Sequence, residues 1–171
     1  INTSAVQTYK LLENLLEWAN SQRGKIPFKP EQINLRDLVE EEFLMLNDMA
    51  LSKNIELGIT FNDNIIIEAD KNMVKTILRN LISNAIKFTP KNGRVETGAI
   101  FINKQIEISV SDNGIGMTGE TIDKLFRLDG NLSTRGTENE KGTGLGLILC
   151  KEFVEKHGGK ITVLTIGAPD A

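Results

Sequence analysis

Two asparagines and a lysine recur at helical spacing in the run Asn80-Leu-Ile-Ser-Asn84-Ala-Ile-Lys87-Phe88. Positions i, i+4 and i+7 share one face of a helix, so Asn80, Asn84 and Lys87 should point the same way. Asparagine is a poor mid-helix residue, because its side chain competes for backbone hydrogen bonds. An amide oxygen suits Mg²⁺ and an ammonium suits phosphate oxygens, so this face predicts a metal–phosphate site. A merely solvated polar face is the alternative explanation.

A second candidate segment, Asp112-Asn-Gly114-Ile115-Gly116, follows a predicted strand. An Asn-Gly pair by itself is commonly just a turn. Here two glycines flank an apolar residue, which would let the backbone approach a flat ligand closely. The carboxylate of Asp112 could accept a hydrogen bond from an exocyclic amine, such as that of adenine. The segment therefore predicts one wall of a site for a flat, amine-bearing ligand.

A third candidate segment opens a predicted helix and reads Gly142-Thr143-Gly144-Leu145-Gly146. Glycines at a helix N-terminus leave backbone N–H groups aimed at an anion, and the helix dipole assists. The G-x-G-x-G spacing matches neither the dinucleotide fingerprint nor the Walker phosphate loop. The polar residues 127–141 before it predict a lid, from which Arg135 could reach a terminal phosphate. A solvated arginine is the alternative at that position.

Helices and strands must position these segments. Helices are expected from Leu35 to about Lys53 after the N-cap Asn34, after the cap Asp70 to about Lys87, and over 121–126 and 145–156. Strands are expected over 55–61, 65–69, 94–102, 105–111 and 160–166. The apolar face of the second helix should form core and comprises Val74, Leu78, Leu81, Ile82 and Ala85. This mixture predicts an α+β fold, a two-layer α/β sandwich whose helices cover one face of a mixed sheet.

The first residues form a separate predicted element. Residues 1–23 contain no Gly or Pro and carry apolar side chains near heptad spacing, which predicts an amphipathic helix. Gly24 ends this helix, and Pro27 and Pro30 prevent its continuation. We therefore divide the chain into an N-terminal helix, residues 1–24, and a main domain, residues 25–171.

Composition narrows the class of protein. The 171-residue chain has a net charge of -3, which argues against a nucleic-acid partner. Its single cysteine, Cys150, lies in an apolar run, so a buried thiol and a reducing, cytoplasmic setting are expected. No apolar run is long enough to span a membrane and no signal peptide is evident, although a membrane segment could lie upstream.

Taken in order, the three segments resemble the N, G1 and G2 motifs of the superfamily that unites sensor histidine kinases, type II topoisomerases, a heat-shock chaperone and a mismatch-repair ATPase. Leu125-Phe126 is placed like the phenylalanine motif of that family, and the similarity spans about Asn34 to Ile166. The resemblance implies that Mg²⁺ and ATP lie between the helices and the lid.

The resemblance also implies a role for each candidate residue. Asn84, assisted by Asn80, would bind Mg²⁺, and Lys87 would contact the phosphates. Asn80 and Lys87 are the expected catalytic residues. Phe88 would pack near the nucleotide, and Asp112 would accept from the adenine amine. The remaining pocket residues would be Gly114, Ile115 and Gly116 at the adenine end, and Gly142, Thr143, Gly144, Leu145 and Gly146 at the phosphate end.

Position 80 separates the branches of this superfamily. Hydrolytic members have a glutamate there as general base, whereas asparagine cannot take up a proton at neutral pH. Asn80, together with Thr89-Pro90 after the motif, resembles the sensor kinases, in which a histidine of another domain attacks ATP. A hydrolytic ATPase module and a degenerate signalling module without activity remain the alternatives, with a serine kinase of the same superfamily as a lesser variant.

Two features depart from the kinase pattern. The phosphoacceptor histidine is missing, and the lone His157 follows the third long helix, where a structural role is expected. The chain also ends at Ala171, before the strand with which the family normally closes. The expected partners are a dimerisation and phosphoacceptor helical domain, a second copy in a homodimer, and a response regulator receiver domain. We expect a cytoplasmic domain, which a membrane-anchored sensor could carry.

Overall fold

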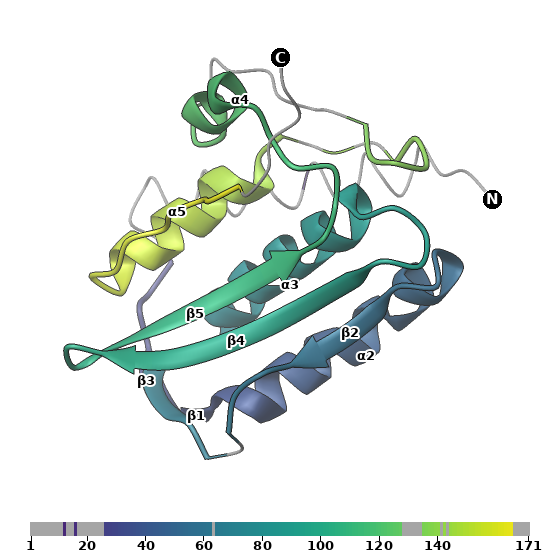
Figure 1. The fold of residues 1–171 in the computed structure, drawn as a ribbon. Coiled ribbons are helices and arrows are strands. Elements are labelled where there is room, and N and C mark those ends of the chain that lie inside the picture. The colour runs from purple at the N-terminus through teal and green to yellow at the C-terminus, as the bar shows by residue number, and fades with distance from the viewer. Residues whose placement is uncertain are drawn as a thin grey trace.

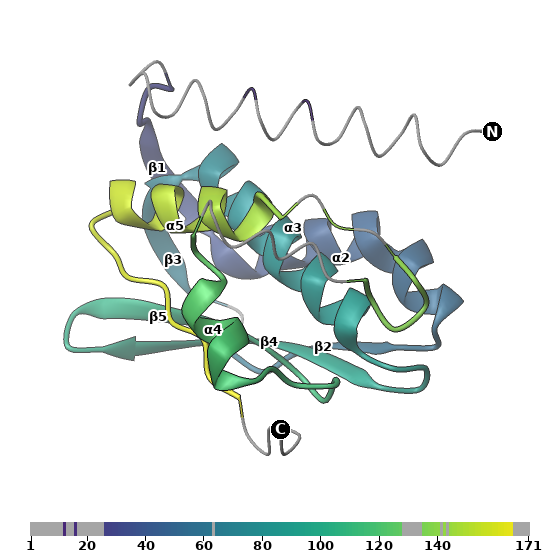
Figure 2. The same ribbon diagram turned by 90° about the horizontal axis from the view of Figure 1, so that it is seen from above.

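The structure, a computed structural model, describes Leu12, Leu16 and residues 26–62, 64–127, 135–140, 142 and 144–165. The elements are, in order, β1 (Pro30–Asn34), α2 (Leu35–Ser52), β2 (Glu56–Ile59), β3 (Ile66–Asp70), α3 (Lys71–Phe88), β4 (Arg94–Ile102), β5 (Gln105–Asp112), α4 (Gly119–Lys124) and α5 (Gly146–Lys156). Figure 1 shows β2, β4 and β5 in front of α2 and α3, and Figure 2 shows α2, α3 and α5 in one layer on these strands. The predicted two-layer α/β fold is confirmed.

The strands form a mixed arrangement in two parts. β4 pairs with β2 in parallel and with β5 antiparallel, while β1 and β3 form an antiparallel pair. β1 was not predicted from the sequence, because Pro30 and the two polar residues after it have no strand-like alternation. The predicted strand over 160–166 was wrong within the described residues: 160–165 form no ladder. A β-rich segment becomes a strand only when a partner edge binds its backbone.

α3 lies between the other two long helices in Figure 2 and carries much of the core. Its N-cap Asp70 accepts from Met73 N–H over 3.1 Å, as its position in the sequence predicted. Leu78 and Ile82 are almost fully buried, and each contributes about 1.5–3 kcal/mol of hydrophobic stabilisation. Leu81, expected in the core, is only half-buried, because it lies at the edge of the apolar face.

α5 packs on α3 through a second apolar cluster of Met73, Leu149 and Phe153. His157 adds a polar connection: its Nε2 accepts from Asp70 N–H over 3.0 Å. Its Nδ1 therefore donates to Phe153 O, over 2.7 Å. The lone histidine thus joins the end of α5 to the beginning of α3.

The predicted N-terminal helix lies outside the described residues except for Leu12 and Leu16, which are exposed. The boundary between residues 24 and 25 also lies outside them. Among the residues that the structure describes, no helix combines the length and the apolar character needed to cross a bilayer.

Candidate functional site

The carboxyl end of α3 is a junction between segments that are far apart in the sequence. The last four carbonyls of a helix have no partner within it, so other groups must bind them. Thr89 binds the Ala85 carbonyl through its own N–H, over 3.0 Å, and its hydroxyl, over 2.7 Å. Ile115 N–H donates to Phe88 O over 3.2 Å, which holds the loop after β5 against the helix.

The two remaining carbonyls bind Lys53, a residue to which the sequence analysis gave no role beyond ending a helix. Lys53 Nζ donates to Ile86 O over 2.8 Å and to Lys87 O over 3.0 Å. Thr137 N–H also donates to Lys87 O, over 3.1 Å. Ile86 lies 33 residues and Thr137 lies 84 residues from Lys53 in the sequence, so no local pattern could have revealed this cluster.

The polar face predicted on α3 is present, and two of its members meet the segment at residues 142–146, hereafter the second glycine segment. Asn80 Nδ2 donates to Thr76 O over 2.9 Å. Its Oδ1 faces Gly146 so closely that a β-carbon there would lie 2.5 Å away, so a larger residue at that position would displace the Asn80 amide. Asn84, one turn further along α3, is half-buried.

Lys87 is buried, with 7% of its surface exposed, and lies beside the start of the second glycine segment. A β-carbon on Gly142 would be 2.8 Å from Lys87 Nζ. Burial lowers the pKa of Lys87, and the negative charge of Glu140 opposes that shift. The ammonium also lies 4.5 Å from the ring centroid of Phe88, a cation–π contact. The predicted phosphate ligand therefore sits in a low-dielectric position at the junction.

The loop after β5, residues 114–116, is the first glycine segment. Asp112 Oδ1 accepts from Gly114 N–H over 2.9 Å, which closes a tight turn directly after the strand. A β-carbon on Gly114 would lie 2.5 Å from Phe88 O, so this loop also abuts α3. Gly116 has φ of +68°, a left-handed conformation that favours glycine. Asp112 and Ile115 are exposed beside this contact.

The remaining predicted residues lie at the edge of this junction or outside the described residues. Leu145 precedes α5 and supplies no side-chain cap, so backbone groups open that helix. Gly144 has φ of +73°, and Thr143 lies outside the described residues. Arg135 is exposed, and the described contacts do not bring it against the other candidates.

A hollow in the described residues lies beside this junction, at the ends of three strands. This polar hollow of about 500 Å³ lies at the edge of β2, β4 and β5, and of the predicted residues only Asp112 lines it. Within the described ranges, no group of three or more His, Cys, Asp or Glu side chains could hold a metal ion. Mg²⁺ commonly binds few protein ligands and several phosphate and water oxygens, so an amide ligand fits that chemistry.

Known proteins resemble this chain over nearly its whole length. The non-motile and phage-resistance protein of Caulobacter vibrioides is 33% identical over 163 residues, which are 93% of this chain and 19% of that protein. The sensor protein GacS of Pseudomonas syringae is 31% identical over 170 residues, with 95% and 19% of the two chains covered. The chain therefore spans about a fifth of the length of these curated relatives.

A solved structure and a family model agree with these relatives. The catalytic domain of histidine kinase ThkA, in a nucleotide-free form, superposes with a TM-score of 0.67 and 29% identity. The match covers 78% of this chain and 87% of that one. The family model described as histidine kinase-, DNA gyrase B-, and HSP90-like ATPase matches residues 69–169, which include α3 and both glycine segments. The chain belongs to this ATPase family, and its homologues include sensor histidine kinases.

Proposed function

We propose that this chain binds Mg²⁺-ATP and donates the γ-phosphate to a histidine on a partner helical domain, as the catalytic domain of a sensor histidine kinase. The convergence of both glycine segments on the carboxyl half of α3 carries this proposal. Asn80 meets Gly146, Lys87 meets Gly142, and Phe88 O accepts from Ile115. Membership in an ATPase family with sensor-kinase homologues supports the same activity.

In this proposal the two ends of the nucleotide bind on either side of Phe88. The adenine amine donates to Asp112, and Gly114, Ile115 and Gly116 form the wall beside it. The phosphates bind Lys87 and the backbone of the second glycine segment, including Thr143, Gly144 and Leu145. Arg135 reaches the terminal phosphate.

Asn84, assisted by Asn80, would hold Mg²⁺, which neutralises phosphate charge when bound. The carbonyl oxygen of Asn84 suits this hard cation. Asn80 already donates its Nδ2 to Thr76 O, so only its Oδ1 is oriented toward the second glycine segment. An asparagine at this position provides no general base for water, which favours transfer to a protein histidine over hydrolysis.

The proposal includes the surroundings of the domain. Residues 1–24 would be the end of a dimerisation and phosphoacceptor helix, and residues 25–171 the ATP-binding domain. The whole protein would act as a homodimer, as a cytoplasmic part of a sensor, and would pass phosphate to a response regulator receiver domain. The chain lacks a candidate phosphoacceptor, because its lone histidine, His157, binds the backbone of Asp70 and Phe153.

Calorimetric titration with a non-hydrolysable ATP analogue, with and without Mg²⁺, tests the binding step. We expect saturable binding that strengthens with Mg²⁺, and no binding at millimolar ligand by a folded chain would contradict the proposal. Radiolabelled ATP then tests the transfer step. The chain should label a supplied helical domain that carries the phosphoacceptor histidine, but not itself. Steady-state hydrolysis without transfer would instead favour the hydrolytic ATPase.

A further inference from the structure

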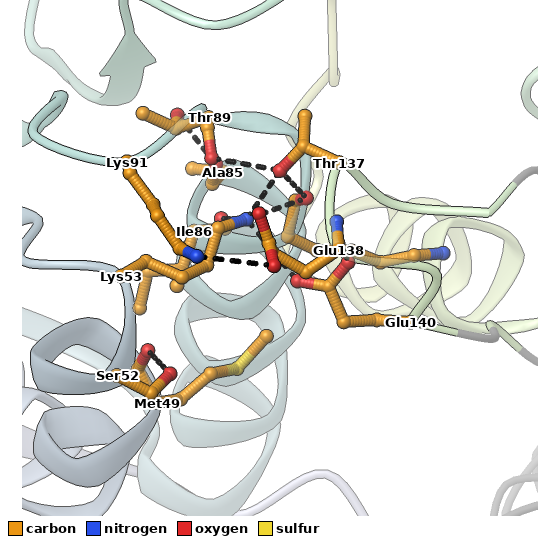
Figure 3. Close-up of polar contacts among 11 residues, drawn as sticks. Met49, Ser52, Lys53, Ala85, Ile86, Thr89, Lys91, Thr137, Glu138 and Glu140 are labelled. Atoms are coloured by element: carbon orange, nitrogen blue, oxygen red, sulfur yellow. Dashed lines mark hydrogen bonds and ion pairs between the residues drawn. The ribbon is translucent and has the colours of Figure 1, made fainter.

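Lys53 is a buried cation that holds four oxygen atoms from two distant parts of the chain. Besides Ile86 O and Lys87 O, its Nζ donates to Thr137 Oγ1 over 2.6 Å and pairs with Glu140 Oε1 over 3.1 Å. Only 3% of its surface is exposed. Figure 3 shows the ammonium between the end of α3 and residues 137–140. Burying a charge is costly unless it is paired, and here a carboxylate and the negative end of a helix compensate it.

Glu140 pairs with this cation and also lies close enough to Lys87, the proposed phosphate ligand, to influence its charge. A β-carbon on Gly136 would touch both Glu140 Oε2, at 2.4 Å, and Lys87 Cγ, at 2.5 Å, so the two side chains flank one glycine. Burial would raise the pKa of Glu140, but the backbone N–H groups of residues 140 and 138, together with Lys53, hold it below its usual value. A carboxylate is therefore fixed beside a group expected to bind phosphate.

A carboxylate at that place opposes phosphate binding in two ways. It repels the phosphate charge, and it competes for the ammonium of Lys87. Lys53 counters both effects, because it binds Glu140 directly and anchors Thr137 to the end of α3. A simple helix-capping lysine would need neither the carboxylate nor the hydroxyl.

We infer that Lys53 is a positioning residue for the phosphates of the nucleotide: it neutralises Glu140 and fixes residues 136–140, so that Lys87 serves phosphate rather than the carboxylate. This inference rests on the proposed nucleotide binding. It adds a residue from the end of α2, 27 positions before Asn80, the first motif residue, to the machinery of the phosphate end.

The test compares two ligands on the whole chain. A non-hydrolysable ATP analogue carries the phosphates, whereas adenosine carries only the base and sugar. Lys53→Met, which keeps the length of the side chain and removes its charge, should raise the Kd of the analogue about tenfold. The Kd of adenosine, measured by NMR titration, should stay within about twofold. Equal losses for both ligands would overturn the inference and leave Lys53 as a support of the fold alone.

A second variant isolates the role of Glu140. The double variant Lys53→Met with Glu140→Gln should recover most of the lost affinity for the analogue, because no carboxylate then remains to compete. Glu140→Gln alone should tighten analogue binding about two- to threefold at low salt, and less at high salt. Weaker binding by this single variant would overturn the inference even if Lys53→Met fails to fold.

Lys91→Met is the matched control. Lys91 pairs with Glu138 over 3.4 Å, on the same segment, but this pair is exposed (Figure 3). Loss of this ion pair should change neither the Kd of the ATP analogue nor that of adenosine, because exposed ion pairs contribute little. If the wild-type chain itself binds no analogue, the proposed function fails. If it binds and the variants behave like Lys91→Met, only the inference about Lys53 fails.

Discussion

Asp112 shows how one side chain can shape a loop and still be available for a ligand. Its Oδ1 accepts from Gly114 N–H, a bond that an asparagine amide oxygen could also accept. Asp112→Asn should therefore preserve the loop but remove the charge that favours an adenine amine. We expect binding of the ATP analogue to weaken by ~1.5–3 kcal/mol, roughly tenfold to more than a hundredfold. Calorimetry measures this, and unchanged affinity at an unchanged melting temperature would place the adenine elsewhere.

Asn84 provides a second test at the scale of single residues, because its predicted role is specific to the metal. Asn84→Ala removes one amide oxygen from a half-buried helix position and should abolish the dependence of ATP binding on Mg²⁺. Phosphate transfer should be lost with it. The matched control is Ser83→Ala, which removes a hydroxyl that donates to Asn80 O over 3.2 Å. If Asn84→Ala still donates phosphate normally, the metal ligand is another residue.

The motif residues could be predicted because their spacing expresses local geometry. The i, i+4, i+7 pattern placed Asn80, Asn84 and Lys87 on one face of α3, and the structure has them there. Lys53 and Glu140 could not be predicted in this way. They meet across 87 residues, and each alone has the appearance of an ordinary surface charge in the sequence. Only the packing of α2 against α3 brings Lys53 to the buried carboxyl end of α3.

At the scale of elements, helices were easier to predict than strands, because the signals that begin a helix are local in the sequence. Asn34 and Asp70 accept from backbone N–H groups two and three residues ahead, so each cap is readable within one turn. β1 is defined instead by its ladder with β3, in which Pro30 lies opposite Asp70. The ladder partners lie 32 residues apart at Asn34 and Ile66 and 40 apart at Pro30 and Asp70, and no local pattern specifies them.

A buried carboxylate joins α2 to α3, and its contribution to stability can be measured directly. Glu42 is fully buried and binds Arg79 through two bonds, of 2.8 and 3.1 Å. Arg79→Met would leave the Glu42 carboxylate buried without this ion-pair partner. Because Arg79 is 40% exposed, solvent compensates in part, so we expect the free energy of unfolding to fall by about 2–3 kcal/mol.

Urea unfolding measures this effect, and two variants serve as controls. Adding Glu42→Leu to Arg79→Met should recover most of the loss, since an apolar pair replaces the unpaired charge. Lys75→Met breaks the neighbouring exposed pair with Glu41 and should cost less than about 0.5 kcal/mol. A loss in Arg79→Met no larger than in Lys75→Met would show that the buried pair does not hold the two helices together.

At the scale of the whole molecule, α3 couples the candidate site to the core. At the amino end of this helix, His157, which follows α5, accepts a hydrogen bond from Asp70 N–H. At the carboxyl end, Lys53, Thr137 and Ile115 donate hydrogen bonds to its last carbonyls. A ligand that binds both α3 and the start of α5 should therefore oppose any opening that separates these helices. Ligand binding to the folded state alone stabilises it by about 2.7 kcal/mol at a hundredfold excess over Kd.

Cys150 offers a probe of that coupling, because it is fully buried on α5 and its thiol donates weakly to Ile77 O of α3 at 3.8 Å. Burial raises its pKa from 9.0 to about 12, so the native thiol stays protonated and unreactive at pH 8. A disulfide reagent should label it only when α5 leaves α3. Mg²⁺ with the ATP analogue at a hundredfold excess over Kd should slow labelling about a hundredfold. As a control, Cys150→Ala with Ser52→Cys carries an exposed thiol on α2, which should react at once with or without ligand. Two results would show that nucleotide binding does not hold α5 against α3. The first is prompt labelling of Cys150 in the wild-type chain. The second is a labelling rate that stays the same although calorimetry confirms that the ligand is bound.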